Sequence, residues 1–212
     1  MSENLENSSF EAQAVQPSEL DERTRHRLIR AAVQVFDRKG YAAASVREIV
    51  EAAGVTKPAL YYHFGSKEGM LGAILEQGAR EFEAAMERAI GRPGTARDRV
   101  TALAVDLYGL FEKNVPVVRV AHSVFHGPAG TAPAFDFTRF DRSLVRALKQ
   151  IVEAGQATGE LRPALAEDVA VAVFGVIGGC VGRQLHPELE PVGVETLRRV
   201  LDLVFDGVVK ER

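Results

Sequence analysis

Helical patterning runs through almost all of this 212-residue chain and limits its fold more than any other feature. From Glu22 onward, apolar residues recur three and four positions apart, as they do on the buried face of a helix. No segment shows the alternation of apolar and polar residues that is typical of a half-buried strand. Glycine and proline separate the helical segments. The sequence therefore predicts an all-α protein.

Start and stop signals divide the N-terminal part of the chain into three helices. The first is expected to end at Gly40, since a glycine after basic residues commonly terminates a helix. Ser45 followed by Glu48 fits a capping box, and the second helix is expected to end at Gly54. Thr56 is expected to cap the third helix. Two short helices joined by a glycine-containing turn predict a helix-turn-helix motif.

The rest of the chain predicts six more helices and a three-part organisation. Their approximate ranges are 67–90, 95–113, 116–126, 134–158, 166–185 and 194–210. We expect residues 1–20 to be a flexible tail, residues 21–70 a helix-turn-helix domain and residues 71–212 a larger helical domain. Residues 21–70 carry nine basic and six acidic residues, whereas residues 1–20 carry four acidic residues and no basic one. A basic block in an acidic chain indicates contact with a polyanion.

Composition excludes several classes of protein. Cys180 is the single cysteine, so the chain has neither an intrachain disulfide nor a cysteine-based zinc cage. The first residues are acidic and polar, unlike a signal peptide. The longest uncharged apolar run, 169–182, is shorter than the roughly 20 residues that a membrane helix needs. These features predict a cytoplasmic protein without a membrane partner.

Several side chains of the third helix remain outward once its core positions are assigned. In a helix-turn-helix this element enters the major groove of DNA. A lysine donates to guanine acceptors, and an alanine or a tyrosine ring contacts a thymine methyl group, whereas tyrosine hydroxyls, a histidine and Lys67 suit phosphate oxygens. The outward residues are Lys57, Pro58, Ala59, Tyr61, Tyr62 and His63.

The segment GVTKPALYYHFGSKE, residues 54–68, is similar to the DNA-binding signature of TetR-type transcriptional regulators. Parts of the preceding run from Ala31 to Ile49 match as well, so the resemblance covers about residues 23–75, roughly a quarter of the chain. It implies a homodimeric regulator that binds a palindromic operator in double-stranded DNA, most often a repressor that a ligand releases. The sequence itself does not exclude activation.

The resemblance also implies roles for individual residues. Arg47 would reach a base or a phosphate from the first helix of the motif. The residues that would face base edges are Lys57, Pro58, Ala59 and Tyr62. Those that would hold phosphates are Tyr61, His63 and Lys67.

Two apolar helices near the C-terminus indicate a dimer interface. The 166–185 helix is apolar on all sides of its central part and holds four glycines, each of which costs about 1 kcal/mol in a helix relative to alanine. Glycines in a helix at this cost are expected to permit the close approach of another helix. The last helix carries an apolar stripe as well. Burial inside one protomer is the alternative, but the resemblance implies a four-helix interface. The expected interface residues are Gly175, Gly178, Gly179, Gly182, Leu197, Leu201, Val204 and Phe205.

The middle of the chain is expected to hold an effector pocket, because phenylalanines concentrate around a loop rich in glycine and proline. The effector would be a small, largely apolar organic molecule, and no cofactor is expected. Ordinary helical core is the alternative for each residue. The pocket candidates are Tyr108, Phe111, His122, Phe125, Phe137 and Phe140, with Arg119 and His126 as further polar anchors.

Two other functions are alternatives. His122 and His126 lie four residues apart, the spacing of paired metal ligands on a helix, and Cys180 or His186 could complete a metal site in a metal-responsive regulator of the same fold. An all-α enzyme is the other alternative. The sequence contains no glycine-rich phosphate loop, no serine elbow and no HExxH motif, so catalysis has little support.

Overall fold

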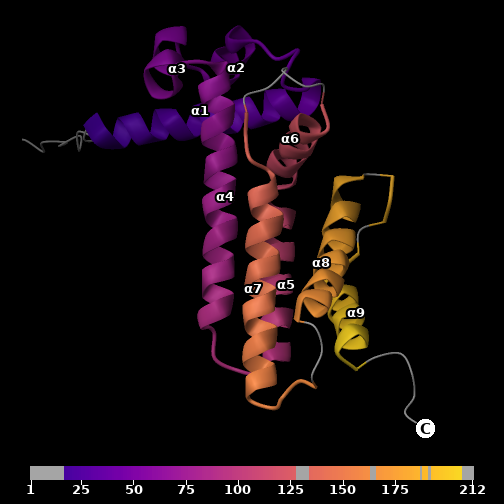
Figure 1. Ribbon diagram of the computed structural model, residues 1–212. Helices are drawn as coiled ribbons and strands as arrows, with labels where there is room; N and C mark the ends of the chain where they lie inside the picture. Colours follow the sequence, from indigo (N-terminus) through magenta and orange to yellow (C-terminus); the bar gives the residue numbers. More distant parts are fainter. Residues whose placement is uncertain (1–16, 128–133, 163–165, 187, 191, 207–212) are drawn as a thin grey trace, which may run out of the picture.

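The protein is all-helical in the part that its computed structural model describes, which comprises residues 17–127, 134–162, 166–186, 188–190 and 192–206 (Figure 1). These residues contain no strand, as predicted. The helices are α1 (Pro17–Lys39), α2 (Val46–Ala53), α3 (Lys57–Phe64), α4 (Lys67–Gly91), α5 (Ala96–Lys113), α6 (Val115–Phe125), α7 (Thr138–Ala157), α8 (Ala166–Gly182), the 3₁₀ turn η1 (Arg183–Leu185) and α9 (Val194–Asp206).

The first helix begins earlier than the sequence analysis predicted. α1 starts at Pro17, so the last four residues of the expected tail are helical. Glu19 lies in the first turn of α1, where a carboxylate interacts favourably with the helix dipole. Residues 1–16 lie outside the described part. The predicted stop is confirmed, because Gly40 follows the helix with a φ of 78° that favours glycine.

The helix-turn-helix is held by local caps. The hydroxyl of Ser45 accepts from the backbone N–H of Glu48, and the carboxylate of Glu48 accepts from the backbone N–H of Ser45, which completes the predicted capping box. Gly54 ends α2 in the left-handed conformation, with φ 61°. Thr56 is the N-cap residue of α3 but its side chain makes no capping hydrogen bond, contrary to expectation. A proline at the start of α3 leaves one fewer N–H group to satisfy there.

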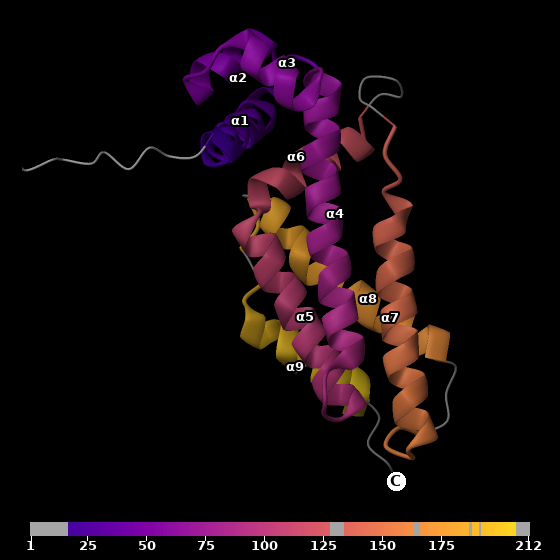
Figure 2. The same cartoon turned by 90° about the vertical axis from the view of Figure 1, so that its left-hand side faces the viewer.

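Two hydrophobic cores lie along α4, which runs through both parts of the molecule (Figure 2). The first core joins α1, α2 and α3 to the N-terminal half of α4, down to Leu75. The second begins at Phe82 and joins the rest of α4 to α5, α7, α8 and α9. α6 contributes Val120 to the first core and packs on α1, although it lies far beyond α1 in the sequence.

The C-terminal helices differ from prediction at their ends and in one face. α7 begins at Thr138, four residues later than expected, after a turn in which the carboxylate of Asp136 accepts from the backbone N–H of Thr138 at 3.1 Å. The expected last turn beyond α9 lies outside the described residues. Leu197 and Leu201 were predicted to lie at the dimer interface. Instead, both are fully buried in the second core of their own protomer. They are the side chains by which α9 packs on its own protomer.

α8 and η1 together form a stretch, Ala166–Leu185, that is long and apolar enough to cross a membrane by length and composition alone. The uncharged part of this stretch, 169–182, is shorter and predicted no such segment. Only 28% of the stretch is buried. One face of α8 packs through Val173 and Ile177 into the second core, while Val171 on the other face is 53% exposed.

Candidate nucleic-acid interface and ligand cavity

α3 lies at one end of the molecule (Figure 1) and carries two large exposed aromatic side chains. Leu60 is fully buried and fixes the helix on the first core. Tyr61 and Tyr62 point away from that core and are 50% and 77% exposed, and Lys57 is exposed at the N-terminus of the helix. Large exposed rings commonly mark a binding surface. The geometry therefore matches a helix that reads a partner with its outer face.

Arg47 lies on the exposed face of α2, as predicted for a DNA contact. Its Nε lies 2.7 Å from an oxygen of Glu51 one turn later, and this hydrogen bond raises the pKa of Arg47. Both side chains are largely exposed, so the pair contributes little to stability. A phosphate could replace Glu51 as the partner of Arg47 at small cost.

Lys67 has an internal role that the sequence did not reveal. Its ammonium donates to the backbone carbonyls of Tyr41 at 3.1 Å and Ala44 at 2.9 Å and lies 4.5 Å from the centre of the Tyr41 ring. These contacts attach the start of α4 to the loop before α2. One of the three N–H groups of Lys67 makes no hydrogen bond to the described residues.

His63 is placed differently from expectation. Its side chain is only 6% exposed, and its Nε2 lies 3.5 Å from an oxygen of Asp21 on α1. The ring also packs edge-on against that of Tyr62. Because α1 covers it, His63 is not presented to a phosphate in this structure, which corrects its assigned role.

Arg27 supports the turn between α2 and α3, a role that the sequence analysis missed. Its Nη2 donates to the carbonyls of Ala53 at 2.5 Å and Gly54 at 2.9 Å, at the C-terminal end of α2. A Cβ at Gly54 would come within 2.8 Å of the same nitrogen. In the sequence Arg27 is one of several basic residues of the first helix, and spacing within one helix does not show which turn it reaches.

A cavity of about 760 Å³ lies among α1, α4, α5, α6, α7, α8 and η1. Five of the six predicted pocket residues line it, namely Phe111, His122, Phe125, Phe137 and Phe140. Tyr108 does not line it and is buried in the second core. Arg119 does not line it either, since its guanidinium is paired with Asp37.

One wall of the cavity consists of packed aromatic rings. Phe137 lies between Phe125 and Phe135, at centroid distances of 5.3 and 4.8 Å, and Phe140 meets Phe82 edge-on at 5.2 Å. Such edge-to-face pairs stabilise one another beyond their buried area. The aromatic wall therefore connects α6, α7 and α4.

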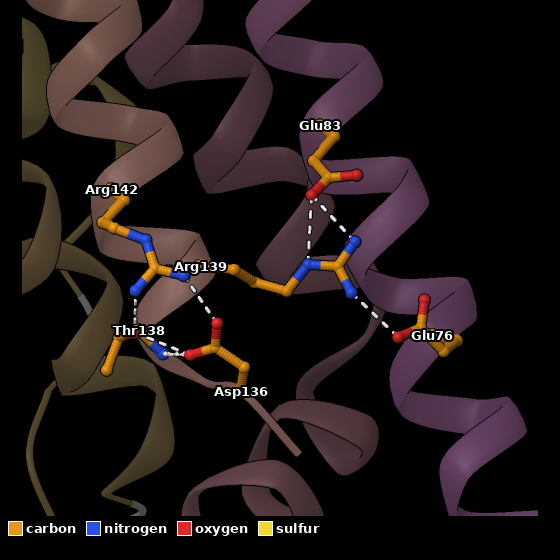
Figure 3. A network of polar contacts seen from close by, with 6 residues as sticks. All are labelled: Glu76, Glu83, Asp136, Thr138, Arg139 and Arg142. Carbon is orange, nitrogen blue, oxygen red and sulfur yellow. Dashed lines mark hydrogen bonds and ion pairs between the residues drawn. The ribbon is translucent and has the colours of Figure 1, made fainter.

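A polar network holds the start of α7 in place beside this wall (Figure 3). Arg139 of α7 reaches across to α4, where its nitrogens lie 2.8 Å from Glu76 and 2.9 Å from Glu83. On the other side of the helix Asp136 pairs with Arg142. The two carboxylates hold the pKa of Arg139 above its usual value. The network fixes the position of the neighbouring Phe137 and Phe140.

α6 contacts both the first core and the cavity. On one side Val120 is buried in the first core, and Arg119 donates to both oxygens of Asp37 on α1. On the other side Val118 and His122 line the cavity. α1 also lines it directly, through residues 29, 30, 33 and 34. A molecule in the cavity would therefore touch both the helix-turn-helix domain and the C-terminal helices.

The metal alternative gains no third ligand. The rings of His122 and His126 lie 4.3 Å apart, and the pKa of His122 is lowered by burial and then by His126 and His186. Cys180 is buried in the second core, where burial raises the pKa of its thiol. Within the described ranges, no three histidine, cysteine or acidic side chains are grouped to hold a metal ion.

The four glycines of α8 fall into two pairs. Gly178 and Gly182 line the cavity. Gly175 and Gly179 are exposed, and a Cβ added at either would meet no atom of the described chain within 4 Å. Val204 and Phe205 are half-buried against the second core, whereas Leu203 of α9 is 54% exposed. The exposed apolar residues and glycines of this region include Val171, Gly175 and Gly179 of α8 and Leu203 of α9.

Known proteins resemble this chain in sequence and in fold. The family model described as bacterial regulatory proteins, tetR family, matches residues 28–74. The transcriptional repressor KstR2 of Mycolicibacterium smegmatis is 30% identical over 152 residues, 68% of this chain and 71% of the repressor. The TetR family regulator PfmR of Thermus thermophilus superposes with a TM-score of 0.71 at 25% identity, over 87% of this chain and 100% of that one. FadR of Bacillus subtilis, solved with stearoyl-CoA, gives 0.68 at 22% identity over 87% and 99% of the chains.

Proposed function

The chain belongs to the TetR family of bacterial transcriptional regulators, which bind DNA and are not enzymes, and from this premise we propose that it is a homodimeric repressor released by a small ligand. The proposal rests on the position of α6, which contributes to the first core and also lines the cavity. The operator would be a palindrome, because a dimer with twofold symmetry reads two equivalent half-sites.

α3 is proposed to enter the major groove. Lys57, Pro58, Ala59 and Tyr62 would face base edges, since they lie on the outer side of α3 and include its N-terminus. Lysine donors match guanine acceptors, and the ring of Tyr62 can contact a thymine methyl group. These residues would choose the sequence.

Phosphate contacts are proposed for residues that flank α3. Arg47 and Tyr61 are exposed, and Lys67 has one N–H left. Phosphate contacts position a protein on DNA without reading its sequence. They would therefore contribute affinity to every DNA and make binding dependent on salt.

The proposed dimer interface is the exposed apolar face of α8 and α9, which lie side by side at one edge of the molecule (Figure 1). Val171 and Leu203 are more than half exposed there, and the open glycines permit close approach of another helix. Two copies meeting through this face would form a four-helix interface. Such an interface explains why an apolar helix as exposed as α8 need not lie in a membrane.

Release by a ligand is proposed to pass through α6 and α1. A ligand shifts a conformational equilibrium only by binding one state more tightly than the other. Because α6 and α1 both line the cavity, a ligand that displaces either helix would move α3 and change the spacing of the two DNA-reading helices in the dimer. We place the protein in the cytoplasm, where it would meet both the chromosome and its ligand.

Selection of genomic fragments by the purified protein tests this function. We expect one inverted repeat to be enriched, with two protomers bound per site, and affinity to fall steeply between two salt concentrations. The matched variants are Lys57→Ala, on α3, and Lys149→Ala, an exposed lysine of α7. Only the Lys57→Ala variant should lose the enrichment of the inverted repeat. Weak binding to all fragments alike, equally in both variants, would overturn the proposal.

A further inference from the structure

The lining of the cavity changes from apolar at depth to polar at its rim. The inner wall consists of residues that are at most 6% exposed and carry no polar side-chain atom, namely Phe82, Leu107, Leu144, Ile177 and Val181. The charged lining residues are all exposed, so they lie where the cavity opens to solvent. A molecule that fills the cavity would therefore have an apolar body and a polar end.

Two cations at the rim of the cavity are unpaired among the residues that the structure describes. Arg30 of α1 and Lys113, the last residue of α5, both line the cavity, and neither side chain makes a hydrogen bond or ion pair with the residues that the structure describes. Asn114 and the first turn of α6 adjoin Lys113, and that turn contains no acidic residue. The rim beside Lys113 is therefore suited to a negative group.

The two carboxylates that line the rim, Glu81 and Asp141, lie on other helices than the two cations. Glu81 already accepts a hydrogen bond from Gln77 at 3.2 Å. Asp141 of α7 is the one lining carboxylate without a contact to the described residues, and it lies on a different helix from the two cations. Among the described residues neither carboxylate pairs with Arg30 or Lys113, so both cations are available to an anionic ligand.

We propose that the cavity takes an amphipathic anion, with a hydrocarbon body in the apolar interior and one carboxylate-like group at Arg30 and Lys113. A body of this kind is bound by burial of apolar area, and the charged group is oriented by charge-assisted hydrogen bonds. The regulatory meaning of this site depends on the proposed function. Because Arg30 belongs to α1, the charged group would contact the helix-turn-helix domain itself.

Binding of three probes of equal chain length tests the proposal. Dodecanoate, dodecanol and dodecyltrimethylammonium are titrated into the DNA-free full-length protein by calorimetry, below their micelle concentrations. We expect dodecanoate to bind about tenfold more tightly than dodecanol, and the cation to bind most weakly. Equal affinity for all three, or tightest binding of the cation, would overturn it.

Charge-removing variants locate the charged group. Arg30→Gln and Lys113→Gln should reduce the affinity for dodecanoate to that for dodecanol and leave dodecanol binding unchanged, which shows that the cavity is intact. Arg88→Gln is the matched control, an exposed arginine of α4 that does not line the cavity. Dodecanoate binding that both rim variants retain would contradict the proposal. The assay contains no DNA, so failure to find an operator affects only the proposed function.

Discussion

Arg119 of α6 donates to both carboxylate oxygens of Asp37 on α1, from Nε at 2.8 Å and from Nη2 at 2.7 Å. The two residues are 82 positions apart in the sequence. The pair lies on the side of α6 away from the cavity, next to Val120 in the first core. It holds the pKa of Arg119 above its usual value, and its fork geometry fixes the orientation of α6 against α1.

Arg119→Gln should weaken the response of DNA binding to a ligand. The variant keeps the buried contacts of α6, so we expect it to fold and bind the operator, but a displaced α6 would no longer pull on α1. The ratio of operator affinities without and with saturating dodecanoate should fall by about 2- to 30-fold. Fluorescence anisotropy of labelled operator measures it.

The pair Arg92–Asp106 provides the control, because it joins residues near the α4–α5 connection and does not reach α1. Arg92→Gln should respond to dodecanoate like the wild type. Asp37→Asn should reduce the ligand response as much as Arg119→Gln does. The double variant should reduce it little further than either single variant. An unchanged ligand response in Arg119→Gln would show that coupling takes another route.

Local signals explain why the helix-turn-helix was predictable. Ser45, Glu48 and Gly54 each satisfy or terminate the backbone of their own helix, so their positions carry the information without knowledge of the rest of the fold. The outward direction of Tyr62 follows in the same way from the burial of Leu60 two residues earlier. The cavity phenylalanines were predictable as a group because they surround one loop.

Other features depend on which helix lies opposite, and one helix does not encode this. The stripe containing Leu197 and Leu201 correctly predicts a buried face of α9, but the side chains that cover it come from the same protomer. His63 has outward spacing on α3, yet α1 covers it. α6 belongs to the first core because Val120 meets residues more than forty positions away.

Lys57 and Lys67 should differ in what their loss changes. Lys57→Ala should cost about 1–3 kcal/mol on the best operator and relax the preference among sequences, because it removes a donor to base edges. Lys67→Met should weaken binding to all sequences. It should also lower the free energy of unfolding by about 1–2 kcal/mol, because the carbonyls of Tyr41 and Ala44 lose their donor.

Operator variants titrated at two salt concentrations, together with urea unfolding, separate these effects. Lys149→Ala should change neither quantity, since this lysine pairs with Glu167 at the surface of the C-terminal helices. If Lys57→Ala and Lys67→Met changed the preference among operator sequences equally, the assignment of base and phosphate contacts would be wrong.

The capping box should make stability depend on acid pH. The ammonium of Lys39, then the hydroxyl and backbone N–H of Ser45, lower the pKa of Glu48 from 4.5 to about 2. A lowered carboxylate pKa stabilises the fold above the unfolded value and loses this effect as the pH falls toward the folded value. Between pH 4.5 and 2, Glu48→Gln should therefore lose stability less steeply than the wild type.

Urea midpoints measured across this pH range provide the test, and the variant should be the less stable protein at neutral pH. Glu87→Gln is the control, an exposed glutamate of α4 without a contact to the described residues. Its stability curve should run parallel to that of the wild type. Parallel curves for Glu48→Gln as well would show that the capping carboxylate is not the group that responds to acid.

Charges on the open face of α8 and α9 should prevent dimerisation without unfolding the protomer. Val171→Glu and Leu203→Glu place a carboxylate on side chains that are 53% and 54% exposed, so each is tolerated in one copy but would be buried unpaired between two. We expect monomers in sedimentation and a loss of tight operator binding. Ile90→Glu, at the far end of α4, is the matched control and should stay dimeric. Dimers in both the Val171→Glu and the Leu203→Glu variant would place the interface elsewhere, and a monomeric wild-type protein would overturn the proposed dimer.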